Sequence, residues 1–196
     1  ETAIAVISLS AGIQMNTMRM VNQAKARGMA VAIVINKYDT DLAGIEELLG
    51  SITESFGMQC RCVNVPSSDG KSIIDCIAKE SGDGILDVAA IHTELLETVV
   101  EVDEALMEAY LGGEAVTPEQ MQKAMVQAVV SQSLIPILFT NATSEIGITE
   151  LLDFCGDYCP SPVTGLKARL VKDKDDESEG VEILPDQNAQ ALGIAF

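Results

Sequence analysis

The apolar run Met29-Ala-Val-Ala-Ile-Val-Ile35 and the turn Asn36-Lys37-Tyr38-Asp39 that follows it decide the fold class of this chain. An apolar run without polar alternation is typical of a strand that is buried on both faces of a parallel sheet. The polar residues come directly after the run, so we expect them beyond the carboxyl end of that strand. Because ligands of open parallel α/β sheets bind at this edge, the turn is a candidate binding site.

Asp39 carries the most specific chemistry in this turn. Guanine presents two adjacent donors, N1–H and the N2 amino group, and one carboxylate can accept from both of them. Adenine has no such pair, so an aspartate fixed here can set base specificity. The alternative is an ordinary strand-to-helix turn in which Asp39 caps the next helix. The four residues alone leave both interpretations open.

Strands and helices alternate along most of the chain. Such alternation predicts parallel strands joined by right-handed crossovers, and therefore an α/β fold. The expected strands span residues 2–8, 30–35, 60–65 and 135–139, and the expected helices span 17–27, 45–56 and 149–158.

The middle of the chain breaks this pattern. Turn clusters at Pro66–Gly70 and Ser81–Gly84 bracket a short helix that we predict near Ile73 to Lys79. Apolar side chains at three- and four-residue spacing predict one long amphipathic helix from Thr93 to Leu111, with glutamates on its other face. The sequence Thr117-Pro118-Glu119-Gln120 predicts the start of a further helix through a capping box.

Composition excludes several function classes. With 196 residues and 47% hydrophobic content, the chain can bury a substantial core. Its net charge of -18 argues against direct binding to an RNA phosphate backbone, and would suit a basic protein partner or simply solubility. Neither a membrane-spanning run nor a secretory leader is recognisable, so we expect a cytoplasmic location and no membrane partner.

The cysteine pattern predicts reduced, buried thiols. The five cysteines have no Cys-x-x-Cys spacing and are Cys60, Cys62, Cys76, Cys155 and Cys159. Four thiolates on two faces could in principle hold zinc, but free cysteine is among the most readily buried residues, so we predict no metal site. The single histidine, His92, is expected to precede the long helix and to be structural.

Further segments connect the Asn-Lys-x-Asp turn to a known family. They are Ala3–Thr17, Glu101–Glu114, Pro136–Leu152 and Cys159–Pro162. In this order, they resemble the guanine-nucleotide domain of bacterial elongation factor G, and the resemblance covers nearly the whole chain. The strand-rich part of that family's inserted subdomain is nearly absent here, which indicates a divergent branch.

The resemblance implies a GTP- or GDP-binding site. By position, Asp39 would accept hydrogen bonds from guanine N1 and N2. Asn36 would connect neighbouring loops and approach the N7 edge of the base, and the aliphatic part of the Lys37 side chain would pack along the base. The second loop implied is Asn141-Ala142-Thr143, in which Ala142 and Thr143 would offer backbone N–H groups near guanine O6. Asn141 stands where the family usually has serine.

A phosphate-binding loop is not recognisable in the sequence. Gly70-Lys71-Ser72 resembles the end of such a loop. The loop requires a glycine five positions before Gly70, where this chain has Val65, and Pro66 lacks the N–H group that would face a phosphate. We therefore interpret Gly70 as part of a turn that starts a short helix. The resemblance places the switch segments and the magnesium ligands upstream of Glu1, so we expect a fragment that has no catalytic residue and is inactive alone.

The expected fold is a partial P-loop-GTPase-type parallel sheet with flanking helices and a helical insertion. Residues 1–58 and 132–160 would form the GTPase α/β part, 59–131 the inserted subdomain, and 161–196 a linker and the start of a β-barrel domain. The whole protein would hydrolyse GTP to drive ribosomal translocation or a related step on the ribosome. A ribosomal stalk protein is a candidate partner of the insertion. The alternative function is a non-enzymatic acidic interaction module with a vestigial nucleotide pocket.

The first strand adds one more expectation. Residues 3–7 are all apolar, and in the family a neighbouring strand that is absent here pairs with this one. An unpaired, flat, hydrophobic edge recruits another chain. We therefore expect the chain to self-associate through Thr2 to Ser8.

Overall fold

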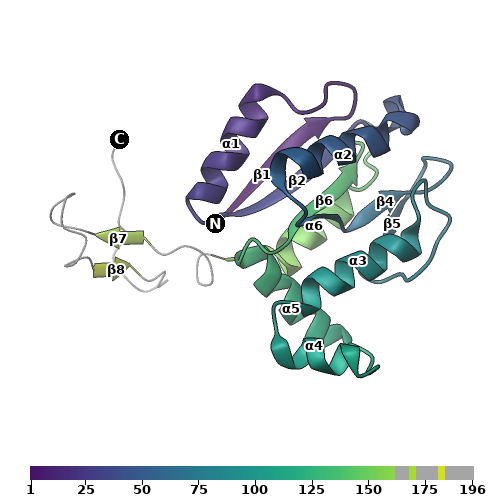
Figure 1. Cartoon of the computed structure of the whole chain (residues 1–196). Coiled ribbons are helices and arrows are strands. Elements are labelled where there is room, and N and C mark those ends of the chain that lie inside the picture. Colours follow the sequence, from purple (N-terminus) through teal and green to yellow (C-terminus); the bar gives the residue numbers. More distant parts are fainter. Residues whose placement is uncertain (162–167, 171–180, 184–196) are drawn as a thin grey trace.

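A four-stranded parallel sheet forms the centre of the computed structural model, which describes residues 1–161, 168–170 and 181–183 (Figure 1). The strand order is β1-β2-β6-β3. Its strands are β1 (Thr2–Ser8), β2 (Ala30–Asn36), β6 (Ile135–Thr140) and β3 (Cys60–Cys62). The predicted α/β fold with a parallel sheet is therefore confirmed.

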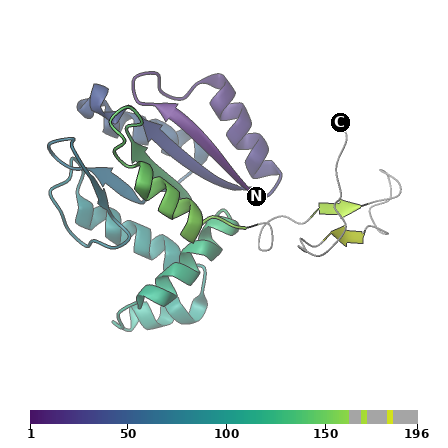
Figure 2. The ribbon, with the colours of Figure 1, turned by 180° about the vertical axis from the view of Figure 1, so that it is seen from behind.

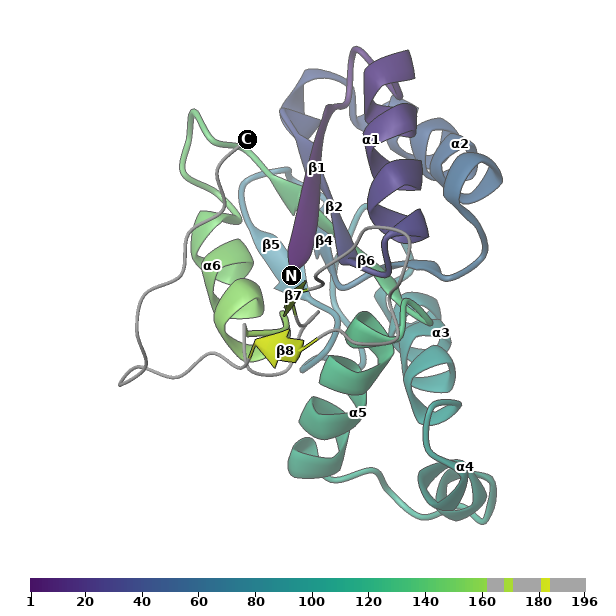
Figure 3. The ribbon, with the colours of Figure 1, turned by 90° about the vertical axis from the view of Figure 1, so that its left-hand side faces the viewer.

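Helices cover both faces of this sheet. Figure 3 shows α1 (Met15–Ala26) and α2 (Ile45–Phe56) on one side and α6 (Ile148–Asp157) on the other. From behind, α6 lies in front of the strands (Figure 2). Ile33 and Ile35 of β2 are fully buried in the core that α1 and α2 share, and Ala32 and Val34, on the other face of the strand, are buried as well. This explains why the apolar run shows no polar alternation.

The strand register brings two loops to the same edge of the sheet. In β1 and β2, Ser8 lies opposite Asn36, and in β2 and β6, Asn36 lies opposite Thr140. Two short 3₁₀ helices, η1 (Tyr38–Thr40) and η2 (Leu42–Gly44), connect β2 to α2. The turn after β2 and the turn after β6 are therefore neighbours.

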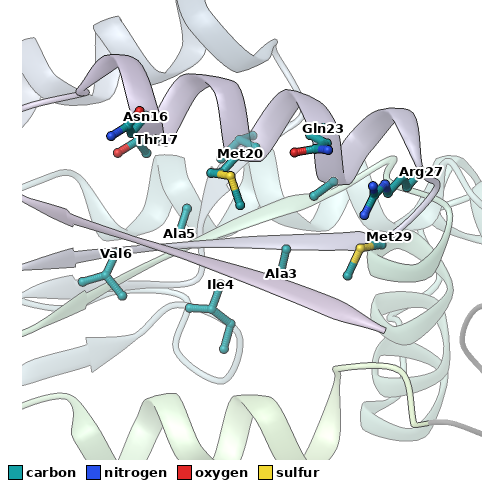
Figure 4. Close-up of a pocket in the computed structure, with 12 residues that line it drawn as sticks. Ala3, Ile4, Ala5, Val6, Asn16, Thr17, Met20, Gln23, Arg27 and Met29 are labelled. Carbon is teal, nitrogen blue, oxygen red and sulfur yellow. The ribbon is translucent and has the colours of Figure 1, made fainter. Parts of the chain in front are cut away.

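β1 lies at the edge of the sheet, as the first strand of the order. Its Ile4 and Val6 side chains are 45% and 61% exposed. Figure 4 shows Ala3 and Ala5 pointing toward α1, and Ile4 and Val6 pointing the other way. Together β1 and α1 line a groove of about 560 Å³. The predicted exposure of this apolar edge is confirmed.

The helical part between β5 and β6 differs from the prediction. The single helix predicted from Thr93 to Leu111 is wrong, because the chain forms α3 (Val88–Val100) and α4 (Glu104–Leu111). Asp103 causes the break, since its carboxylate accepts from the N–H groups of Ala105 and Leu106 and starts a new helix. α5 (Pro118–Val130) begins with the predicted capping box.

The helix predicted near Ile73 to Lys79 is also wrong. Residues Ile73–Asp75 form β5, which pairs antiparallel with β4 (Asn64–Pro66). β-Branched side chains at 73 and 74 fit this hairpin better than a helix. The single strand predicted from Cys60 to Val65 is split into β3 and β4. β3 pairs with β6 in the main sheet, whereas we assigned all residues from 59 onward to the insertion.

Smaller differences concern element ends and the C-terminal part. α1 begins at Met15 rather than Thr17, and α6 begins and ends one residue earlier than predicted. β7 (Ala168–Leu170) and β8 (Val181–Ile183) form an antiparallel pair. The remainder of 162–196, with most of the predicted linker and start of a β-barrel domain, lies outside the described residues. Within the described ranges, every helix is too short or too polar to cross a membrane.

Candidate functional site

The Asn36 side chain links the two loops at the carboxyl edge of the sheet. Its Oδ1 atom accepts from the backbone N–H of Lys37 at 2.9 Å and from that of Ala142 at 3.1 Å. The second bond joins residues 106 positions apart in the sequence. The structure thus brings together both halves of the predicted site, the turn after β2 and the turn after β6.

Asp39 is exposed and does not cap the following helix. Among the described residues, its carboxylate makes no hydrogen bond in the structure. Asp41 takes the capping position of η2 and accepts from the N–H of Gly44 at 3.2 Å, and the residue before α2 is Gly44. The helix-cap interpretation of Asp39 therefore fails, and its carboxylate is available to a ligand.

Lys37 has a left-handed backbone that shapes this turn. Its φ is 59°, and its carbonyl accepts from the Thr40 hydroxyl at 2.8 Å and the Thr40 N–H at 3.2 Å. Both Lys37 and Asp39 are exposed, while Tyr38 between them is buried. The turn therefore directs its charged side chains outward and its aromatic ring inward.

The second loop is closed on itself. Asn141 is 4% exposed, its backbone exchanges two hydrogen bonds with Ile146, and its Oδ1 atom accepts from the N–H of Thr143 at 3.2 Å. The N–H groups of Ala142 and Thr143, which the resemblance assigns to guanine O6, thus both donate within the protein in this structure. Both residues are exposed, so the loop surface itself is accessible.

Gly147 makes the close approach of this loop to β6 possible. Its φ is +77°, and a Cβ atom there would overlap the carbonyl oxygen of Phe139 and lie 3.2 Å from the Cα of Thr140. A side chain at this position would push the loop away from the strand. The glycine therefore sets the distance between the loop and the edge of the sheet.

Tyr38 is a residue of this turn to which sequence analysis assigned no role. Its ring meets Phe139 edge-on, with 6.5 Å between centroids, and its hydroxyl donates to the carbonyl of Gly70 at 3.0 Å. Burial, and secondarily the nearby Asp39 carboxylate, raises the pKa of the phenol above its ordinary value. The hydroxyl therefore stays protonated, as a donor must.

Gly70-Lys71-Ser72 lies in the turn between β4 and β5. A phosphate-binding loop instead connects a strand to a helix, whose N-terminus faces the phosphates. The inference that this segment is not a phosphate cradle is therefore supported, while the short helix expected after it is replaced by β5. The structure assigns no residue of this segment to phosphate or magnesium.

Three of the five cysteines, Cys60, Cys62 and Cys76, are buried, and the other two are half-buried. Burial raises the pKa of the Cys60 thiol to about 11 and that of Cys76 to about 12, so both are protonated. His92 lies within α3 rather than before it, and its Nδ1 is 2.8 Å from the carbonyl oxygen of Cys76. Over the described part of the chain, no three His, Cys, Asp or Glu side chains are grouped to hold a metal ion.

Known proteins resemble most of this chain. Residues 1–161 match the family described as the elongation factor Tu GTP binding domain. An elongation factor G-like protein of Thermotoga maritima is 27% identical over 175 residues, which cover 83% of this chain and 26% of that protein. Elongation factor G of Mycoplasma genitalium is 27% identical over 216 aligned positions, which cover 100% of this chain and 31% of that protein.

A solved structure shows the same fold. The crystal structure of a Thermus thermophilus protein superimposes with a TM-score of 0.69 at 28% identity, over 80% of this chain and 26% of that one. The chain thus spans between a quarter and a third of the length of these relatives.

Proposed function

The chain belongs to the family of elongation factor Tu GTP-binding domains, and we propose that it carries the guanine-recognition site of an elongation factor G-like GTPase. One observation carries this proposal: Asn36 joins the turn after β2 to the turn after β6, next to an Asp39 carboxylate that caps nothing. A guanine base placed between the turns could donate N1–H and N2–H to that carboxylate.

The other residues of the two turns would support this recognition. The exposed Lys37 can lay its aliphatic stem along one face of the base while its ammonium stays in water. Asn36 is already engaged with Ala142, so its role is to hold the two turns together. Recognition of guanine O6 by Ala142 or Thr143 requires one of their N–H groups to exchange its internal partner for the base.

The whole protein would bind GTP and GDP and hydrolyse GTP. Phosphoryl transfer of this kind depends on positioning and on electrostatic stabilisation by a phosphate-binding loop, switch segments and magnesium. None of these functions is assigned to the described residues, so we assign no catalytic residue and no magnesium ligand to this chain. We place the whole protein in the cytoplasm, on the ribosome, in translocation or a related step, with the insertion contacting a ribosomal stalk protein.

Competition binding with the full-length protein tests the proposal. Unlabelled GDP, IDP and ADP compete against a fluorescent GDP analogue at constant salt. We expect GDP to compete best, IDP less well because inosine lacks the N2 donor, and ADP least. Equal competition by GDP and ADP would contradict guanine recognition and would favour the acidic interaction module.

The 196-residue chain by itself should release no phosphate from GTP above background. No described residue forms a phosphate cradle, and nucleotide bound through its base alone has no stabilisation of the transferred phosphoryl group. Phosphate release with magnesium present measures this. Turnover that survives further purification would show that the phosphate site lies within these residues after all.

The isolated chain should also self-associate through β1. Ile4 and Val6 are exposed on an edge strand, and a second copy of β1 can satisfy the free N–H and C=O groups of that edge. A net charge of -18 opposes this association, so it should strengthen with added salt. Val6→Lys should give a monomer in sedimentation, whereas Met58→Lys, at a residue 68% exposed outside the sheet, should not. A wild-type chain that stays monomeric at high salt would refute the pairing.

A further inference from the structure

The aromatic residue in the middle of the base-recognition turn connects that turn to the hairpin of β4 and β5. Tyr38 is fully buried, while its neighbours Lys37 and Asp39 are exposed. Its hydroxyl donates to the carbonyl oxygen of Gly70 at 3.0 Å, across 32 positions of the sequence. A displacement of Tyr38 therefore moves Asp39 on one side and is resisted by the hairpin on the other.

The hairpin turn that accepts this bond is held by its own hydrogen bonds. The Ser67 N–H donates to the carbonyl of Ser72 at 2.9 Å, and the Gly70 N–H donates to the carbonyl of Ser67 at 2.8 Å. The Asp69 carboxylate accepts from the Ser67 hydroxyl at 2.7 Å and from the Lys71 N–H at 3.0 Å. With φ at +68°, Gly70 takes the left-handed conformation that this turn requires. The carbonyl that receives the Tyr38 hydroxyl is thus fixed in direction.

The other end of the hairpin holds the strand that precedes the second loop. Asn64 of β4 is 3% exposed, and its Oδ1 atom accepts from the backbone N–H of Phe139 in β6 at 2.6 Å. Phe139 in turn packs edge-on against Tyr38. The hairpin therefore contacts the first turn through Tyr38 and Gly70, and the strand that precedes the second turn through Asn64 and Phe139. Hydrogen bonds in such buried surroundings are costly to leave unmade.

We propose that Tyr38 is a positioning residue that couples the β4–β5 hairpin to the guanine site, so that guanine nucleotide further stabilises the hairpin and the hairpin strengthens nucleotide binding. This coupling rests on the proposed function, because it requires a base at Asp39. Since coupling between two sites is reciprocal, removal of the hydroxyl must weaken both effects by the same factor.

Tyr38→Phe in the full-length protein tests the coupling, since it removes the hydroxyl and keeps the ring against Phe139. GDP should slow amide hydrogen exchange at Gly70 and Ser72 in the wild type but not in the variant. The variant should bind GDP about 2- to 10-fold more weakly, the range expected for one partly buried hydrogen bond. Its preference for guanine over xanthine should stay unchanged, because Asp39 is intact.

Tyr110→Phe serves as the matched control. Tyr110 is a half-buried tyrosine of α4, outside the two turns and the hairpin, so its variant should behave as the wild type in both measurements. Asp69→Ala loosens the hairpin turn while it keeps the Tyr38 hydroxyl, and should reduce the GDP-dependent gain in protection at Gly70 in the same direction. If Tyr38→Phe does not fold, this second variant carries the test.

The two proposals fail in different ways. Wild-type affinity and full GDP-dependent protection in both Tyr38→Phe and Asp69→Ala would overturn the coupling and leave guanine recognition intact. A wild type that shows no preference for GDP over ADP would overturn the proposed function itself.

Discussion

Replacing Asp39 by asparagine in the full-length protein should move its preference from guanosine to xanthosine nucleotides. Xanthine carries an acceptor where guanine carries the N2 donor, and an asparagine amide can donate to it while its oxygen still accepts from N1–H. In the proposed complex the wild-type carboxylate would accept two charge-assisted hydrogen bonds from guanine, so the substitution should cost on the order of 2–5 kcal/mol in GDP affinity.

Asp41→Asn is the matched control for this experiment. Asp41 lies two positions further along the same connection and caps η2 through the N–H of Gly44. The same chemical change there should alter stability slightly and base preference not at all. Competition of GDP and XDP against a fluorescent nucleotide measures both variants. If Asp39→Asn discriminates between the bases as the wild type does, Asp39 does not read the base.

Gly147→Ala should destabilise the protein by about 2–5 kcal/mol. The φ of +77° disfavours any side chain, and the new Cβ would overlap the carbonyl oxygen of Phe139. Relief of this overlap requires the second loop to move away from β6, which also separates Ala142 from Asn36. Chemical denaturation of the chain measures the loss of stability, and nucleotide affinity in the full-length protein should fall with it.

Gly113→Ala separates the two causes of this effect. Gly113 has a φ of +84°, but a Cβ atom there would meet no other atom within 4 Å. This variant therefore carries only the cost of the left-handed backbone, about 1–2 kcal/mol. If the two variants lose the same stability, the contact between Gly147 and Phe139 is not tight.

Elements with a strong local signal could be predicted from the sequence. The β2 strand followed its apolar run, α2 followed its amphipathic pattern from Ile45 to Phe56, and α5 followed its capping box. The two turns of the candidate site could also be placed, because parallel strands present their carboxyl ends at one edge. Local pattern and tertiary structure agree at these positions.

The remaining features depend on hydrogen bonds and contacts that hydrophobic periodicity does not reveal. The pattern from Thr93 to Leu111 is continuous, and only the Asp103 side chain, turned back onto the N–H groups of Ala105 and Leu106, breaks it into two helices. Ile73–Asp75 is a strand because β4 lies beside it, which no local periodicity reveals. The bond from Tyr38 to Gly70 likewise requires the fold before it can be seen.

A crystal structure of the full-length protein with GDP would show whether the Asp39 carboxylate binds the guanine base. We expect the base between the turns after β2 and β6, with guanine N1 and N2 each about 2.7–3.1 Å from an oxygen of the Asp39 carboxylate. A base bound elsewhere, or one at this edge whose N1 and N2 donate to other groups while Asp39 remains in solvent, would contradict it.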